Sequence, residues 1–308
     1  MTHKKIRIGT RESQLALWQA TLVHDLLAGH GVEAELVPIK SDGDIDLKTP
    51  LYEMGVQGIF TRSLDAALLQ QRIDIAVHSM KDVPTQLPAG IVQAAVLRRG
   101  PVHDLLVFKT DGQFLSHPER GARIATSSIR RKAQWLHRYP GHQIDNLRGN
   151  VNTRLRKLAE EPWDGAIFAL AGLERINLRP AGSLILDWML PAPAQGAILV
   201  VCRQGDGLAL EACQPIHDAD TELCTRIERD FLRGLSGGCS TPISALAEIE
   251  RDELIFRGHI LSVDGVQKFE VEKILPVEMA HQTGLAAAGE LLSTGAKHLV
   301  ERMQHAGK

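Results

Sequence analysis

Short apolar runs alternate with helical patterns along most of the first two hundred residues. The first strand pattern, Lys4–Gly9, is followed by apolar residues near helical spacing at Leu15, Trp18 and Leu22. The alternation restarts at Arg123–Thr126, which a second helical pattern follows. Strands that alternate with helices are typical of α/β folds, so we predict two sheets with mainly parallel strands.

The pattern changes near residue 216. Three segments there alternate between apolar and polar residues, as strands of an antiparallel sheet do: Ile243–Ile249, Glu253–Ser262 and Gln267–Leu275. A closing amphipathic helix is expected over His281–Gln304. We therefore predict a third, α+β domain. The expected division gives residues 1–98 and 197–214 to domain 1, 99–196 to domain 2 and 215–308 to domain 3.

Several classes of protein are disfavoured by the sequence. No apolar run reaches the roughly 18 residues of a membrane span. No signal peptide is evident at the start, so we expect a cytoplasmic protein. The four cysteines are Cys202, Cys213, Cys224 and Cys239, without Cys-x-x-Cys pairs or zinc-like spacing to histidines. We expect free thiols and no bound metal.

Positive charge is concentrated in the middle of the chain. Residues 120–180 contain twelve Lys and Arg against five Asp and Glu, although the whole chain has a formal net charge of −2. This distribution favours a local site for an anion; the alternative is chance clustering on a solvated surface. Aromatic residues are only 4% of the chain, so the stacking side chains of a single-stranded nucleic-acid site are missing.

One strand pattern stops in a group of polar residues. The apolar run Ile73–Val77 is followed by four of them before Pro84: His78, Ser79, Lys81 and Asp82. Pro84 ends regular structure, and ligands of open α/β sheets bind at the carboxyl ends of strands. A solvated Lys–Asp pair is an equally good interpretation of this segment alone. For His78 we favour a structural histidine whose ring nitrogens have partners.

Arginine recurs where a strand pattern turns into a helix pattern. It does so at Arg11 before Ser13, in Thr126–Arg131, and in Leu147–Arg154, with Arg175 as a further possible case. An arginine in the first turn of a helix opposes the helix dipole unless an anion binds beside it. The turns therefore predict a ligand with several carboxylates or phosphates. The alternative is a simple capped helix for the turn of Arg11 and Ser13, and a solvated surface for Thr126–Arg131. The chain has no Gly-x-x-x-x-Gly-Lys-Ser/Thr cradle for a nucleotide.

The fourth cysteine differs from the others in its setting. Cys239 follows two glycines in the loop Leu235–Pro242, where a large group could approach closely. It could be a nucleophile, an attachment point or only a loop cysteine. The other three lie in strand or helix patterns and are expected to be core thiols.

Seven segments together resemble the porphobilinogen deaminase (hydroxymethylbilane synthase) family, in family order and across nearly the whole chain. They are Gly9-Thr-Arg-x-Ser-x-Leu-Ala-Leu, His78-Ser-Met-Lys-Asp-Val-Pro, Thr126-Ser-Ser-Ile-Arg-Arg, Leu147-Arg-Gly-Asn-Val-x-Thr-Arg, Ala171-Gly-Leu-x-Arg, Pro193-x-Gln-Gly-Ala and Gly237-Gly-Cys. The resemblance implies two lobes of the type II periplasmic-binding-protein kind, facing each other across a cleft, and a third domain. It also implies a cytosolic, monomeric transferase of tetrapyrrole and haem biosynthesis.

The family reaction condenses four porphobilinogens head to tail, releases ammonia each time, and ends by hydrolysis to hydroxymethylbilane. The resemblance makes Cys239 the covalent attachment point of a dipyrromethane cofactor and Asp82 the catalytic residue. It assigns cofactor binding to Lys81, Ser79, Ser127, Ser128, Arg130, Arg131, Arg148 and Gly149. It assigns substrate binding to Arg11, Ser13, Arg148, Arg154, Arg175 and Gln195. Porphobilinogen is the expected substrate, with no nucleic-acid, membrane or obligatory protein partner.

The sequence departs from the family pattern at a few positions. Glu53 and Gln57 stand where many relatives carry lysine, Ala194 replaces a usual glycine, and Val201 replaces a usual glutamate. None of these is the aspartate, the cysteine or one of the arginines, so we expect activity to survive. Two competing hypotheses remain: a non-enzymatic anion-binding protein on the same scaffold, and a hydrolase that uses Cys239 as its nucleophile.

Overall fold

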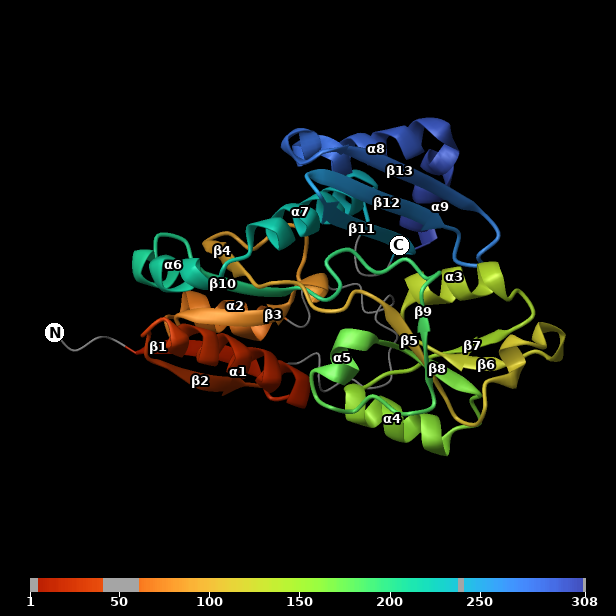
Figure 1. The fold of residues 1–308 in the computed structure, drawn as a ribbon, viewed down its shortest axis with the longest axis horizontal. Helices are drawn as coiled ribbons and strands as arrows, with labels where there is room; N and C mark the ends of the chain where they lie inside the picture. Colours follow the sequence, from red (N-terminus) through yellow and green to blue (C-terminus); the bar gives the residue numbers. More distant parts are fainter. Residues whose placement is uncertain (1–4, 41–60, 238–240, 307–308) are drawn as a thin grey trace. The chain divides into compact units, whose positions relative to one another are not determined.

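The computed structural model of the chain describes residues 5–40, 61–237 and 241–306. These residues form two compact units. One contains the described residues up to 40, residues 61–100 and Gly196–Glu222; the other contains Pro101–Gln195 and the described residues from 223 onward. Figure 1 shows the elements of both units in sequence colours. The expected division into three domains remains a prediction.

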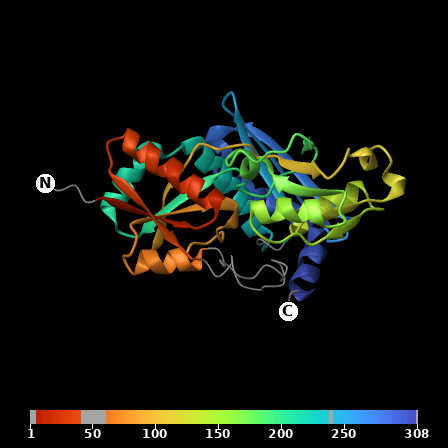
Figure 2. The ribbon, with the colours of Figure 1, turned by 90° about the horizontal axis from the view of Figure 1, so that it is seen from below.

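The first unit is built on a five-stranded sheet in the order β2-β1-β3-β10-β4. Its elements are β1 (Ile6–Arg11), α1 (Gln14–Gly29), β2 (Ala34–Ile39), α2 (Arg62–Leu69), β3 (Ile75–Ser79), β4 (Ile91–Val96), β10 (Ile198–Arg203) and α6 (Gly207–Cys213). The helices α1 and α6 bury apolar side chains such as Val23 and Ala209 against one face. The helix α2 lies on the opposite face (Figure 2). The sheet is therefore covered on both sides, as in α/β folds.

A second five-stranded sheet, in the order β7-β6-β8-β5-β9, forms part of the other unit. Its elements are β5 (Asp104–Phe108), β6 (Arg123–Ala125), α3 (Ile129–Arg138), β7 (Gln143–Asp145), α4 (Val151–Glu160), β8 (Gly165–Ala169), α5 (Leu170–Glu174) and β9 (Ser183–Leu186). Leu158 of α4 and Leu173 of α5 pack on one face, and Trp135 of α3 packs on the other. The strand β9 was not predicted, because it is short and two of its four residues, Leu184 and Ile185, are exposed.

The prediction of two α/β sheets is confirmed, but the sheets are mixed rather than mainly parallel. In the first sheet, β1 pairs parallel with β2 and β3, whereas β10 pairs antiparallel with β3 and β4. In the second, β6 is parallel to β7 and β8, whereas β5 is antiparallel to β8 and β9. The antiparallel strands β5 and β10 are the first strands after the chain passes into each sheet from the other unit. No helical crossover within the same sheet precedes them, so the preference for parallel pairing does not apply.

The C-terminal part is α+β, as predicted. A three-stranded antiparallel sheet, β11 (Ile243–Glu250), β12 (Glu253–Leu261) and β13 (Lys268–Pro276), packs with α7 (Ala219–Gly234), α8 (Thr283–Leu291) and α9 (Lys297–Ala306). The single closing helix expected over His281–Gln304 is wrong. The segment Leu292–Ala296 interrupts it, because Gly295 has a φ of 122°, which no helix contains.

Candidate functional site

The turn that follows β1 is fixed by two hydroxyl groups. Ser13 caps α1, and its Oγ accepts a hydrogen bond from the Ala16 N–H at 3.4 Å. The buried Thr10 donates to the Ala16 carbonyl at 3.0 Å. Arg11, the last residue of β1, is half-buried. The turn therefore holds Arg11 and Ser13 together at the carboxyl end of the strand.

The strand β3 ends beside β1, at the same edge of the sheet. The two strands are parallel neighbours, with Gly9 opposite Ala76, so their carboxyl ends lie on the same side. Ser79 closes β3 and exchanges hydrogen bonds with Gln19 of α1 at 2.9 and 3.2 Å. Gln19 is a residue that our reading of the sequence missed. The signal that could have identified it is a polar residue on the apolar face of a predicted helix.

Asp82 lies on a short 3₁₀ turn, Met80–Asp82, that directly follows β3. The turn is held from both sides: the Met80 N–H donates to the Ala197 carbonyl at 3.1 Å, and the Val83 N–H donates to the Met80 carbonyl at 3.1 Å. Lys81 and Asp82 are both half-buried. The carboxylate of Asp82 is thus carried by fixed backbone at the strand edge that also carries Arg11, Ser13 and Ser79.

The predicted strand over Ile73–Val77 actually runs from Ile75 to Ser79, so His78 lies within it. His78 is only 6% exposed, and its Nε2 has no hydrogen-bond partner in the described part of the chain. Our expectation of a histidine whose nitrogens all have partners is wrong. Burial first, and then the positive charge of Arg11, lower the pKa of His78 to about 4. The imidazole is therefore neutral at pH 7.

In the second unit, the segment after β6 is organised by its hydroxyl groups. Thr126 accepts from the Ser128 N–H at 3.2 Å, and Ser128 caps α3 by accepting from the Arg131 N–H at 3.4 Å. Ser127 and Ser128 are both half-buried. The cap sets the direction in which α3 begins, and with it the positions of the two arginines in its first turn.

Both of these arginines are buried and bind the same carboxylate, Asp104, the first residue of β5. Arg130 Nη2 lies 2.6 Å from Asp104 Oδ2, and Arg131 Nη2 lies 2.8 Å from Oδ1. Backbone carbonyls bind the remaining Nη1 atoms: Leu190 at 2.7 Å from Arg130 and Ile167 at 2.9 Å from Arg131. Burial lowers the pKa of Arg130, and the negative charge of Asp104 partly offsets this decrease. In the sequence, Asp104 could have been identified as a charged residue at the start of an apolar strand pattern.

Gln195 joins the same cluster. Its side-chain amide donates to Asp104 Oδ1 at 2.9 Å and to the Val102 carbonyl at 2.7 Å. The preceding Ala194 has a φ of 61°, a left-handed conformation that explains why glycine suits this position. The N–H of Ala194 donates to the buried carboxylate of Glu228 at 2.6 Å, which holds the segment in that conformation.

The arginine-bearing turn before α4 depends on one glycine. Asn150 caps α4 through the Thr153 N–H at 2.9 Å, and Arg154 Nε donates to the Gly149 carbonyl at 2.7 Å. Arg148 is buried, with 4% exposure. Gly149 has a φ of 112°, and a Cβ atom there would lie 2.8 Å from Thr153 Cβ. The turn that carries Arg148 and Arg154 therefore requires glycine.

The substitution Gly149→Ala is expected to lower the free energy of unfolding by roughly 1–3 kcal/mol, because the backbone conformation disfavours a side chain. Gly182→Ala is the matched control, since a Cβ atom at Gly182 meets no atom within 4 Å. Its effect should stay within about 0.5 kcal/mol. Urea unfolding curves of both variants measure the difference. Equal effects of the two substitutions would contradict the requirement for glycine.

The remaining predicted residues are placed as follows. Arg175 directly follows α5 and is half-buried, and burial lowers its pKa to about 10. Cys202, Cys213 and Cys224 are buried free thiols, which confirms their assignment to the core. Burial raises the pKa of Cys202 to about 11 and of Cys213 to about 12, so neither is a thiolate at pH 7. Cys239, Glu53 and Gln57 lie outside the described residues.

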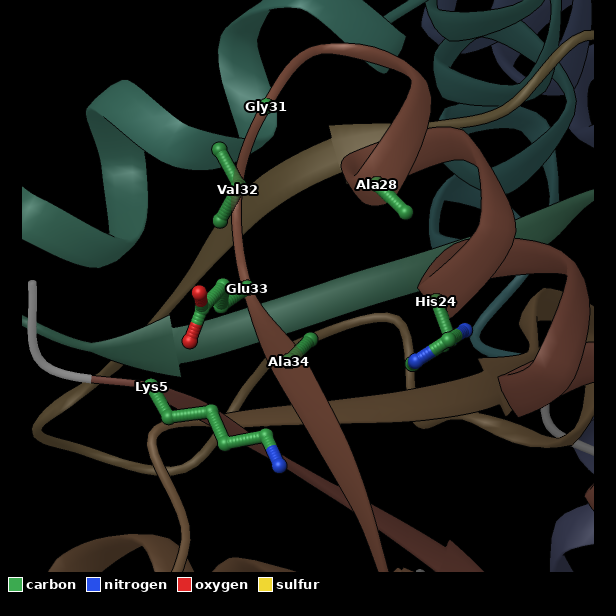
Figure 3. A pocket seen from close by; sticks show the side chains of 7 residues that line it. All are labelled: Lys5, His24, Ala28, Gly31, Val32, Glu33 and Ala34. Atoms are coloured by element: carbon green, nitrogen blue, oxygen red, sulfur yellow. The ribbon is translucent and has the colours of Figure 1, made fainter.

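Other kinds of site find little support in the described part of the chain. It contains no group of three or more His, Cys, Asp or Glu residues that could hold a metal ion. No helix within it is both long and apolar enough to cross a membrane. One hollow opens between the end of α1 and the start of β2, away from the carboxyl ends of the strands. It is lined by Lys5, His24, Ala28, Gly31, Val32, Glu33 and Ala34 (Figure 3).

The chain was compared with models of known protein families. Residues 6–211 match the family model described as porphobilinogen deaminase, dipyromethane cofactor binding domain. The chain belongs to the porphobilinogen deaminase family. Residues 222–293 match the C-terminal domain of porphobilinogen deaminases. The arginine-bearing turns, the Asp82 turn and the Asp104 cluster all lie within the first match.

Individual porphobilinogen deaminases are similar over most of their length. That of Syntrophotalea carbinolica is 44% identical over 304 residues, which cover 97% of this chain and 96% of that protein. The chloroplastic porphobilinogen deaminase of Oryza sativa subsp. japonica is 43% identical over 294 residues, covering 91% and 82%. Among solved structures, the second substrate binding domain of a putative amino acid ABC transporter from Streptococcus pneumoniae is similar with a TM-score of 0.44. The two are 11% identical, over 69% of this chain and 91% of that one.

Proposed function

We infer that this chain is a hydroxymethylbilane synthase, a transferase that joins four porphobilinogen molecules head to tail. Each condensation releases ammonia, and hydrolysis finally frees the linear hydroxymethylbilane. The observation that carries this function is the match of residues 6–211 to the cofactor-binding domain of porphobilinogen deaminases, with relatives 44% identical over nearly the whole chain.

We propose Asp82 as the catalytic residue. Loss of ammonia from an aminomethylpyrrole leaves a cationic azafulvene, and a carboxylate fixed nearby stabilises that charge as it develops. The same carboxylate can hold the pyrrole N–H and exchange a proton with the leaving amine. The proposal is supported by the backbone hydrogen bonds that fix the turn Met80–Asp82 at the end of β3.

Each pyrrole carries an acetate and a propionate group, so the ligand is a polyanion. We propose that the arginines named above bind these carboxylates, Arg11 at one strand end and Arg148, Arg154 and Arg175 at others. Guanidinium groups suit this role because they present paired donors in a fixed plane. Ser13, Ser79, Ser127 and Ser128 would add hydrogen bonds, and Lys81 a further positive charge.

The cofactor that the family implies is dipyrromethane, attached through Cys239. When bound, it supplies the pyrrole carbon that attacks the incoming unit. The donor set fits such a group, because Arg130 and Arg131 share one carboxylate and no described residue accepts a hydrogen bond from the buried Nε of Arg130. The cluster can therefore accept a further anion. Arg130, Arg131, Ser127 and Ser128 would hold its carboxylates.

We propose that the protein is cytoplasmic. Free buried thiols at Cys202, Cys213 and Cys224 suit a reducing compartment, which supports a cytoplasmic location. We further propose a monomer that needs no protein or nucleic-acid partner.

Incubation of the purified full chain with porphobilinogen tests the function. We expect one hydroxymethylbilane, detected as uroporphyrin after cyclisation and oxidation, for every four ammonia molecules released. Binding of porphobilinogen without ammonia release would instead support the anion-binding protein. Hydrolysis of an ester or amide substrate, abolished by alkylation of Cys239, would support the thiol hydrolase.

A further inference from the structure

The carboxylate of Asp104 binds the two arginines to which the proposed function assigns the cofactor, and also Gln195, which the sequence analysis expects to bind substrate. Its side chain has no exposed surface. Oδ2 accepts from Arg130 at 2.6 Å, and Oδ1 accepts from Arg131 Nη2 and Nε at 2.8 and 3.1 Å. The Gln195 amide adds a bond to Oδ1 at 2.9 Å. One buried carboxylate thus fixes two guanidinium planes and one amide.

The backbone that carries Asp104 is itself rigid. Asp104 begins β5, which is paired on both sides: Asp104 lies opposite Ala169 of β8 and opposite Leu186 of β9. Arg130 and Arg131 come from α3, and Gln195 comes from the segment before β10. Asp104 therefore joins two separate parts of the unit, α3 and the segment before β10, to an interior strand of a sheet. A side chain held in this way is suited to fixing the geometry of others.

The charges in this cluster do not balance. The side chains of Arg130 and Arg131 are 5% and 6% exposed, and they share one carboxylate. The other acceptors bound to their guanidinium groups, the carbonyls of Leu190 and Ile167, are neutral. Burying an excess charge costs free energy, which a ligand anion reduces when it binds. Within residues 5–40, 61–237 and 241–306, no acceptor binds Arg130 Nε, which leaves this donor for such an anion.

We propose that Asp104 is a positioning residue, which fixes Arg130, Arg131 and Gln195 as one preformed site. The two arginines and one carboxylate leave this site with a net charge of +1, which attracts the carboxylates of the bound pyrroles. This inference rests on the proposed function. Asp104 does not touch the ligand in this scheme. It acts by holding the groups that do, and by neutralising only one of the two arginines.

The variant Asp104→Asn tests the proposal, since it keeps the shape of the side chain and removes its charge. In the full-length protein, intact-mass spectrometry measures the fraction of chains that carry the dipyrromethane adduct. We expect this fraction to fall at least fivefold in Asp104→Asn. A folded Asp104→Asn protein with the wild-type adduct fraction overturns the proposal. Wild-type protein without any adduct would instead contradict the proposed function itself.

Asp74→Asn is the matched control. Asp74 is a buried aspartate that also pairs with two arginines, Arg7 at 2.8 Å and Arg203 at 3.5 Å, but it lies at the opposite end of β3 from Ser79. Both substitutions should lower the melting temperature. Only Asp104→Asn should lower the adduct fraction, and an equal loss in Asp74→Asn would show a purely structural effect and overturn the positioning role.

Asp104→Glu decides the question if Asp104→Asn does not fold. It keeps the charge but moves the carboxylate by one methylene, so we expect a folded protein that carries less than half of the wild-type adduct. If both variants fold, the adduct fraction should rise in the order Asn, Glu, Asp. Wild-type loading and an unchanged KM for porphobilinogen in Asp104→Glu would overturn the proposal.

Discussion

Asp82→Asn should reduce the turnover of porphobilinogen at least hundredfold while leaving its binding nearly unchanged. The amide keeps the size and the hydrogen-bonding shape of the side chain, but it cannot stabilise a cationic azafulvene or accept a proton. Losses of about 10²–10⁴ are usual when a positioned acid or base is removed. Ammonia release at saturating porphobilinogen measures turnover, and intact-mass spectrometry detects bound pyrrole units.

Two controls separate chemistry from folding in this experiment. Asp82 is half-buried on a short turn, so the melting temperature of Asp82→Asn should stay near that of the wild type. Asp25→Asn removes an exposed carboxylate from α1, outside the proposed site, and should keep full turnover. Near-normal turnover of Asp82→Asn would refute its catalytic role.

Cys239→Ser should lose the covalent adduct and, with it, nearly all activity. A serine hydroxyl is a far weaker nucleophile than a thiol at pH 7, so the thioether to dipyrromethane cannot form readily. Intact-mass spectrometry should show a two-pyrrole addition on the wild type and none on the variant. Ehrlich's reagent should colour only the wild-type protein.

The buried cysteines provide the control for attachment. Cys202 is fully buried and its thiol is protonated at pH 7, so Cys202→Ala should keep the adduct. If Cys202→Ala lost the adduct and Cys239→Ser kept it, the cofactor would be attached to Cys202, and the proposed attachment to Cys239 would be wrong. An unmodified yet fully active Cys239→Ser protein would exclude the proposed function altogether.

Local chemistry explains why the elements of this chain were predictable. At the N-caps Ser13 and Ser128, a hydroxyl beside a helix start satisfies backbone N–H groups only a few residues away. The strands β11 and β12 begin at the predicted residues, Ile243 and Glu253, for a similar local reason. Apolar spacing within each segment decides which face is buried.

Local sequence patterns did not predict how the strands pair or which residues bind the buried charges. The antiparallel insertion of β10 between β3 and β4 depends on contacts between segments about a hundred residues apart. The sharing of Asp104 by Arg130, Arg131 and Gln195 is equally non-local, with up to 91 residues between partners. A sequence pattern records neighbours along the chain, whereas these contacts arise only when distant elements pack.

The sequence by itself determined the family, the alternation of strands and helices, and the residue types that meet a polyanion and its leaving amine. Arg11, Asp82 and Arg148 are recognisable because their segments are short and chemically distinctive. Only the tertiary structure decided that two of the predicted arginines are buried and share a carboxylate that no motif contains. The physical reason is that burial, and the charge balance that burial demands, are properties of the packed chain rather than of any segment of it.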